Sequence, residues 1–295
     1  MRHLIVIVML LVLALVCGAL LAVPVYKLLH ALVDIQLHKL VPQVISITGL
    51  LLLLAWLGHQ KRLDRATLGY PARPGATVTR QVLTGFFAGT MIIAVLATAL
   101  VLLGIHQVET DLEFNLAAGV SITLRAMFTG VMVGLIEETL YRGALLGALL
   151  ARMPPLHAIV VGSVIYSAAH FLKFSEAPTG LDITWTSGLL MLPSAFYRFS
   201  DPAILDALLS LLAFGVLLSL VRWKSGAIYL CIGVHAGVVT AMKIVNKTTD
   251  YVPHNTLAFM VNRYDHMLGY LALLWLISCI LLYYQYTRAD RGMDG

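Results

Sequence analysis

Long apolar segments separated by short polar turns run along almost the whole chain. A helix needs about 20 apolar residues to cross a hydrocarbon core about 30 Å thick. By this measure the chain contains eight candidate spans, at residues 4–24, 41–58, 83–104, 118–151, 156–173, 203–221, 226–244 and 266–286. No polar loop between them reaches domain length. The pattern therefore predicts an all-α fold, a polytopic transmembrane helix bundle with about eight spans.

Composition supports a membrane protein and excludes a soluble one. The 295 residues are 60% hydrophobic and only 12% charged, with a mean hydropathy of +0.89. Soluble domains carry about 25% charged residues. The net charge of +5 does not indicate nucleic-acid binding, because the basic residues lie in short loops between apolar segments, where they set topology. We therefore expect the lipid bilayer to be a partner and nucleic acid not to be one.

The loop charges predict an orientation. Residues 59–82 carry Lys61, Arg62, Arg65, Arg73 and Arg80, whereas residues 105–117 carry acidic residues and no Lys or Arg. Basic loops are retained in the cytoplasm. We therefore place the 59–82 loop in the cytoplasm. With eight crossings, both termini are then cytoplasmic as well.

Three charges stand inside the fourth apolar segment. Glu137, Glu138 and Arg142 fall within six residues of one another. A charge at the bilayer centre costs at least about 2.5–3.5 kcal/mol, so an ionisable residue at this depth is a functional-site hypothesis. On a helix Glu138 and Arg142 share one face at i and i+4 and can neutralise each other. Glu137 is rotated about 100° away, faces Tyr141, and is left as an available base.

Two later apolar segments each contain a histidine. His170 lies near the end of the fifth segment and His235 in the middle of the seventh. One carboxylate and two histidines support two chemistries. Glu137 can take a proton from a water that attacks an amide carbonyl, with the imidazoles orienting water or stabilising the oxyanion. Alternatively the same three groups ligate Zn²⁺, although no His-Glu-x-x-His motif is present.

These residues resemble a known family. Glu-Glu-x-x-x-Arg, then an aromatic-x-x-x-His and a later intramembrane His, is similar to the CAAX protease and bacteriocin-processing family of intramembrane proteases, which includes type II prenyl-protein endopeptidases. The first motif matches at Glu137, Glu138 and Arg142, and Tyr166 stands where Phe is usual in the second. In the third motif His235 is followed four residues later by Val239, where the family has Asn or Asp. Asn246 is a poor substitute because it lies three turns further on.

The resemblance implies a function and a division of the chain. It implies an intramembrane endopeptidase in a bacterial inner membrane, cleaving a peptide or membrane-protein substrate. Glu137 with His170 would activate water, His235 would assist, and Glu138 with Arg142 would organise the site. Residues 118–245 form the protease-like core. Residues 1–110 form three N-terminal spans with the basic loop, and residues 246–295 the last span and cytoplasmic tail.

Several questions stay open at this stage. We expect no obligatory cofactor, with zinc at Glu137, His170 and His235 as the alternative. Val239 favours a second reading, a non-catalytic scaffold or immunity factor that keeps the fold, and a proton-coupled transporter is the third. The oligomeric state is not predicted. For Glu137 to reach His170, the crossing part of the fourth segment must be residues 128–150, so we expect residues 118–127 to be interfacial or broken.

Overall fold

The computed structural model describes residues 2–32, 34–109, 115–175 and 182–292. Its elements, in chain order, are α1 (Arg2–His30), α2 (Leu37–His59), α3 (Gly75–Leu102), β1 (His106–Val108), α4 (Leu116–Glu138), η1 (Thr139–Leu145), α5 (Leu146–Leu150), α6 (Pro155–His170), α7 (Ser187–Leu190), α8 (Leu192–Ala195), η2 (Tyr197–Ser200), η3 (Pro202–Ile204), α9 (Leu205–Ser225), α10 (Tyr229–Thr248), β2 (Thr249–Tyr251), η4 (Ala258–Met260) and α11 (Tyr270–Gly292). The predicted all-α bundle is confirmed. Its short two-stranded sheet pairs His106 with Tyr251 and was not predicted.

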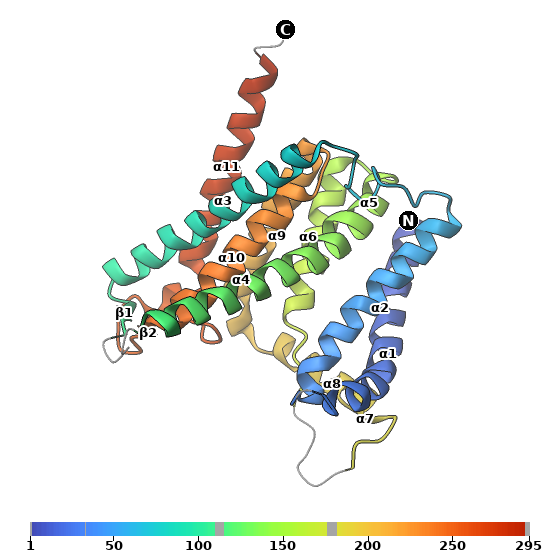
Figure 1. Ribbon diagram of the computed structural model, residues 1–295, viewed down its shortest axis with the longest axis horizontal. Coiled ribbons are helices and arrows are strands. Elements are labelled where there is room, and N and C mark those ends of the chain that lie inside the picture. Colours follow the sequence, from blue (N-terminus) through green and yellow to red (C-terminus); the bar gives the residue numbers. More distant parts are fainter. Residues whose placement is uncertain (1, 33, 110–114, 176–181, 293–295) are drawn as a thin grey trace.

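Helix α10 is the centre of the bundle. It packs against α3 and α4, which run beside it as a group of inclined helices, and α9 lies between this group and α6 and α11 (Figure 1). The pair α1 and α2 stands apart and contacts the rest mainly through η1 and α7. A cluster containing Ile7, Leu57 and Leu145 buries the contact between this pair and the helix of the acidic motif. The core of the molecule therefore lies around α10.

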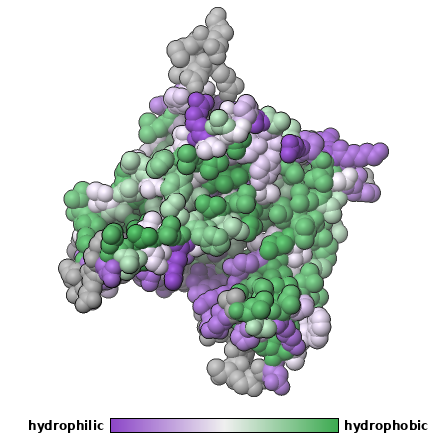
Figure 2. Space-filling model, in the orientation of Figure 1, coloured by the Kyte–Doolittle hydropathy of each residue, from purple (hydrophilic) through white to green (hydrophobic). Residues whose placement is uncertain are grey.

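Seven helices in the described part of the chain are long and apolar enough to cross a membrane. They correspond to seven of the eight predicted spans. The remaining one, residues 156–173, is α6, which has only 16 residues and ends at His170. Such a helix is about 24 Å long, shorter than the hydrocarbon core. Figure 2 shows apolar side chains over the outer faces of the helices and hydrophilic ones near the ends and in the hollow below α4.

The fourth segment differs from its prediction. Helix α4 begins at Leu116, with the side chain of Asn115 accepting a hydrogen bond from the Ala117 amide, and the helical run continues to Leu150. The expected break at residues 118–127 is therefore wrong, while the other expectation, that these residues are interfacial, stays a prediction. The irregularity lies later, in η1, a π-helical segment of seven residues that includes Arg142. Helix α4 runs inclined to α1 and α2 (Figure 1), and tilting is one way in which a long apolar helix fits a bilayer.

The segment 174–202 contains the short helices α7 and α8 in its described part. These pack on the ends of α1 and α2. Gly188 approaches the backbone of Ala19, and Met191 and Ala195 join a buried cluster with Val41. The segment therefore closes one end of the α1–α2 pair.

Candidate active site

Four elements bring the predicted site residues together. Helix α4 ends with Glu137 and Glu138, η1 carries Arg142, α6 ends at His170, and α10 carries His235. Helices α5 and α6 meet at the turn of residues 151–154. Glu137 lies 13 residues before Leu150 and His170 lies 15 after Pro155, so each is about 20 Å from this turn. Equal lengths along two adjoining helices place the carboxylate and the imidazole at the same depth.

Close packing of α4 on α10 sets the position of His235. A Cβ added to Gly134 would lie 2.9 Å from the Ile232 carbonyl oxygen, and one added to Gly130 would lie 2.5 Å from that of Ala236. Only glycine allows the two backbones to approach this closely. The small-residue spacing on α4 thus brings His235 within reach of the acidic pair.

Glu138 is the centre of a buried network. Its Oε1 atom accepts hydrogen bonds from Arg142 Nη1 at 2.9 Å and from His235 Nδ1 at 2.7 Å, and its side chain is fully buried. Arg142 also donates to the Gly215 carbonyl on α9 and lies 4.2 Å from the ring centroid of Tyr166. The predicted Glu138–Arg142 pair is present. The bond to His235 was not predicted, and it joins the pair to a third helix.

Glu137 faces both histidines. Its Oε2 atom lies 3.6 Å from His170 Nε2 and 3.9 Å from His235 Nε2. These separations exceed a hydrogen bond. The Oε2 atom is buried and makes no hydrogen bond with any described residue. A water molecule in contact with Oε2 can reach both imidazole nitrogens, which is the usual way to bridge polar atoms more than 3.5 Å apart.

The second nitrogen of each imidazole sets its tautomer. His170 Nδ1 lies 2.8 Å from the Tyr166 carbonyl oxygen, which can only accept, so Nδ1 carries the hydrogen. His235 Nδ1 faces the Glu138 carboxylate in the same way. A neutral imidazole then presents an unprotonated Nε2. In that neutral form both Nε2 atoms would face Glu137 as hydrogen-bond acceptors.

The π-helical segment connects the site to the basic loop. The Leu146 amide donates to the Tyr141 carbonyl, five residues back, which is the wider π register. At the first residue of η1, the Thr139 hydroxyl lies 2.6 Å from that of Tyr70. Single π turns occur often at functional sites. Here one follows Glu138 directly and contains its partner Arg142.

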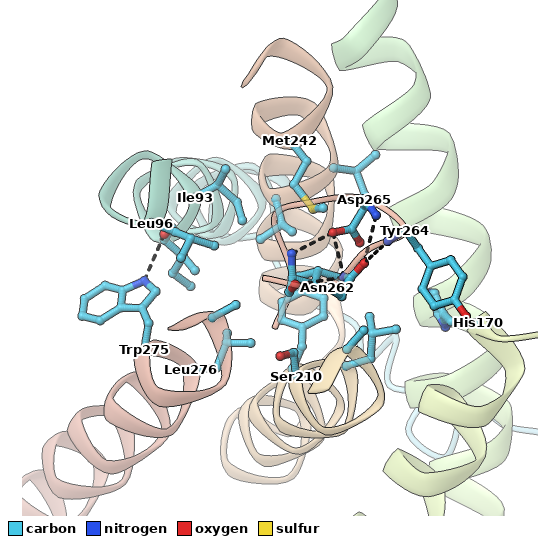
Figure 3. A pocket seen from close by; sticks show the side chains of 18 of the residues that line it. Ile93, Leu96, His170, Ser210, Met242, Asn262, Tyr264, Asp265, Trp275 and Leu276 are labelled. Carbon is cyan, nitrogen blue, oxygen red and sulfur yellow. Dashed lines mark hydrogen bonds between the residues drawn. The ribbon is translucent and has the colours of Figure 1, made fainter. Parts of the chain in front are cut away.

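A cavity of about 260 Å³ opens beside the two histidines. Mostly apolar side chains from α3, α9, α10 and α11 line most of it, and Figure 3 shows part of this lining together with His170 and the loop residue Asn262. Val239 is part of this lining. The position where the resembled family has a polar residue therefore faces the cavity next to His235, and here it is apolar. Asn246 does not line the cavity and is exposed.

The polar residues at the rim of this cavity were missed by sequence reasoning. Arg198 and Tyr264 line the rim, with the guanidinium 4.2 Å from the phenol ring centroid. Asp201 accepts from Tyr264 and pairs with Arg263, which joins the two loops. The Ala203 amide and the Tyr264 hydroxyl, then the charge of Arg263, hold the pKa of Asp201 below its usual range. No sequence spacing relates these loops, since their contact depends on the packing of α9 and α11.

Both the nitrogen and the oxygen of the Asn262 side-chain amide already form hydrogen bonds within the protein. Its Nδ2 donates to Asp265 and to the Leu268 carbonyl, while its Oδ1 accepts from the Tyr264 and Asp265 amides. Ser210, also at the cavity, donates to the Gly269 carbonyl. Neither replaces the polar group that is absent at Val239.

The fit of a metal ion was tested on the side chains themselves. The described residues contain no group of three or more His, Cys, Asp or Glu side chains spaced to hold one. The donor types at Glu137, His170 and His235 suit zinc, but the spacing of their donor atoms does not. We therefore derive no step through a metal.

Comparison with known proteins gives one match. Residues 119–241 match the family model described as "Rce1-like: Type II CAAX prenyl endopeptidase Rce1-like". A search of curated proteins found no match, and a search of solved structures found none either. The whole Glu-Glu-x-x-x-Arg motif and both intramembrane histidines fall inside the matched segment. The predicted resemblance is therefore confirmed: residues 119–241, less than half of the chain, are similar to the type II CAAX prenyl endopeptidase Rce1-like family.

Proposed function

We propose that the chain is an intramembrane endopeptidase in which Glu137 and His170 activate a water molecule, assisted by His235. One observation carries the proposal. The Oε2 atom of Glu137 is buried, lacks a hydrogen-bond partner among the described residues, and faces two imidazole nitrogens at 3.6 and 3.9 Å. A buried carboxylate oxygen without a partner is costly unless something binds there. A water molecule that donates to Glu137 Oε2 and to one of the two imidazole nitrogens is the simplest occupant that could react.

The reaction follows from this geometry. Glu137 accepts a proton from the water as its oxygen bonds to the carbonyl carbon of the scissile amide, and the carbonyl oxygen becomes an oxyanion. Glu137 then returns the proton to the leaving amine as the carbon–nitrogen bond breaks. His170 and His235 orient the water. A proton on either Nε2 atom would allow that histidine to donate to the oxyanion.

Glu138 and Arg142 have a positioning role in this scheme. Glu138 forms the buried pair with Arg142, so Glu137 is the carboxylate left to take the proton from water. Glu138 is fully buried and its Oε1 atom accepts from both Arg142 and His235, whereas the partly exposed Glu137 faces the Nε2 atoms of both histidines. The buried pair therefore holds His235 in place and leaves Glu137 to react.

The cavity and its surroundings indicate the class of substrate. It is mostly apolar, adjoins both histidines and lies among membrane-spanning helices. Such a site suits an apolar stretch of a peptide or membrane protein. We propose no obligatory metal.

Val239 favours the second candidate function, a non-catalytic scaffold or immunity factor. It lines the cavity where an oxyanion donor would stand, and the nearby amide of Asn262 and hydroxyl of Ser210 are committed elsewhere. A protein without proteolytic activity would not require a hydrogen-bond donor to an oxyanion at this position. The two candidates differ in whether the unaltered chain cleaves any peptide.

The test is cleavage of a peptide library by the chain in proteoliposomes, with Glu137→Gln and His170→Ala as variants. Loss of the base or its partner removes general-base catalysis, so we expect rates to fall by about 10²–10⁴-fold. His157→Ala is the matched control, because this exposed histidine lies on the same helix α6 far from the site. It should leave the rate unchanged.

Three outcomes would contradict the scheme. Full cleavage by both site variants would remove Glu137 and His170 from the mechanism. A folded, unaltered chain that cleaves nothing in the library would favour the scaffold. Loss of cleavage on treatment with a chelator, restored by zinc, would establish the metal-dependent alternative.

A further inference from the structure

A second cavity, of about 530 Å³, lies at the opposite end of the bundle from the Asp201 rim. The loop between α2 and α3 forms most of it, with Arg65, Tyr70 and Arg73 on its walls, and Tyr229 at the start of α10 completes it. No acidic residue lines this cavity. The nearest acidic side chain in sequence, Asp64, uses both oxygens on Thr67, at 2.8 Å to the amide and 2.8 Å to the hydroxyl.

The two arginines of the cavity have free hydrogen-bonding capacity. Arg65 is exposed, and its guanidinium makes no hydrogen bond or ion pair with any residue that the structure describes. Arg73 is held by one bond, from Nη2 to the Ser225 carbonyl at 2.9 Å. A guanidinium has five N–H donors, so most of those on Arg73 remain unused. Planar pairs of such donors match the oxygens of a phosphate.

The cavity wall is preformed. The Tyr70 and Tyr229 rings meet edge to face at 5.7 Å, and the Tyr229 hydroxyl donates to the Pro71 carbonyl. Arg222 fixes the loop between α2 and α3 by donating a hydrogen bond to the Ala66 carbonyl oxygen at 3.0 Å. Gly69 permits this contact, since its φ of +75° and the guanidinium against its Cα leave no room for a side chain. A loop held in this way needs little reordering on binding.

The surroundings place this cavity at a membrane surface. The loop contacts the turn after α5, where Arg62 reaches the Ala151 carbonyl. In the same turn the Arg152 guanidinium lies 4.4 Å from the ring centroid of Trp56. Tryptophan and arginine at helix ends are typical of the interface between lipid and water. Anionic headgroups are concentrated at the cytoplasmic surface, where this basic loop is expected.

We propose that this cavity binds the phosphate of an anionic phospholipid headgroup, with Arg65 and Arg73 as its contacts. The cavity is basic, lacks carboxylates, has unused guanidinium donors and lies at a helix end. A free phosphate compound offers the same chemistry but lacks the acyl chains that would hold it at the bilayer surface. The site is independent of proteolysis. Its loop adjoins the helical run of the acidic motif through the hydrogen bond of Tyr70 to Thr139 and through the packing of Leu68 against Gly143.

The test measures binding of fluorescent phosphatidylglycerol to the purified full chain in neutral detergent. Arg65→Gln should weaken binding by about tenfold or more, because a charge-assisted hydrogen bond is lost. Arg80→Gln is the matched control, since it removes the same charge from an exposed position on α3 outside the cavity. It should change binding by less than about threefold, because only long-range attraction is reduced. Arg73→Lys keeps the charge but loses the planar fork, and should also weaken binding.

Unaltered thermal unfolding of each variant shows that the fold is retained. Equal weakening by Arg65→Gln and Arg80→Gln would overturn the site in favour of diffuse surface attraction. Competition separates the two sources of phosphate. Unlabelled phosphatidylglycerol should displace the probe, whereas phosphatidylcholine and glycerol phosphate should not. Displacement by glycerol phosphate at the concentration effective for the lipid would overturn the lipid assignment.

Discussion

Glu137 and Glu138 are neighbours in sequence with different surroundings. Local periodicity predicts the pairing of Glu138 with Arg142, because both belong to one helix at i and i+4. The bond from His235 to Glu138 joins residues 97 positions apart and could not be read from any spacing. It depends on how closely α10 packs against α4. The same packing leaves Glu137 as the carboxylate that faces the Nε2 atoms of His170 and His235.

This difference in surroundings predicts that a Gln substitution lowers the free energy of unfolding strongly at Glu138 and only slightly at Glu137. Glu138→Gln leaves Arg142 buried without its counter-charge, and removing one partner of a buried pair lowers the free energy of unfolding by about 3–5 kcal/mol. Glu137→Gln should change it by less than about 1 kcal/mol, since its Oε2 atom has no described hydrogen-bond partner to lose. Unfolding of both variants in detergent measures the difference. Equal losses of stability would contradict the assignment of Glu138 as the structural carboxylate.

At the scale of elements, the lengths of the apolar segments predict where the helices lie. They do not predict the hydrogen-bond register within a helix. The eight apolar segments correspond to the seven long helices and the shorter α6. The π register of η1 has no recognisable pattern, because the same side chains could form an ordinary α-helix. Its position depends on tertiary bonds of Arg142 and Thr139. The Gly130 and Gly134 spacing, in contrast, indicates close packing, and α10 is the helix that approaches.

A single methyl group should disturb this packing. In Gly134→Ala the new Cβ would lie 2.9 Å from the Ile232 carbonyl and 3.1 Å from the Ala236 amide, so α4 and α10 must separate. Overpacking of this kind costs about 1–3 kcal/mol. It should also reduce cleavage, because His235 moves with α10. Gly75→Ala, at a position with nothing within 4 Å, is the control for unfolding in detergent. Equal stability of the two variants would show that the helices do not meet closely at Gly134.

At the scale of the molecule, the basic turns gather at one end. Arg62 reaches the turn after α5, and Arg73 reaches the turn after α9. The described start of α1 lies at the same end, since Ile7 packs with Leu57 near the end of α2. Charge counts along the sequence predict this grouping, because each turn is basic by itself. The cavity beside the histidines could not be predicted, since its walls come from five helices and two loops that meet only after the bundle has formed.

The grouping of basic turns makes the orientation testable. A cysteine introduced by Ala66→Cys lies in the basic loop, and one introduced by Thr256→Cys lies in the exposed loop after β2 at the other end. Basic turns are retained in the cytoplasm. A membrane-impermeant maleimide should therefore label Thr256→Cys in intact bacterial cells whose outer membrane has been made permeable. It should label Ala66→Cys only in inverted vesicles.

The three native cysteines lie within helices, so the unaltered chain supplies the background labelling. Reversed labelling of the two variants would invert the topology, and labelling of both from one side would exclude a single orientation. The result also decides from which side substrate arrives. Glu137 and His170 lie about 20 Å along their helices from the basic turn of residues 151–154, whereas the cavity rim at Asp201 lies at the other end of the bundle. With the basic turns in the cytoplasm, the rim of the cavity faces the far side of the membrane.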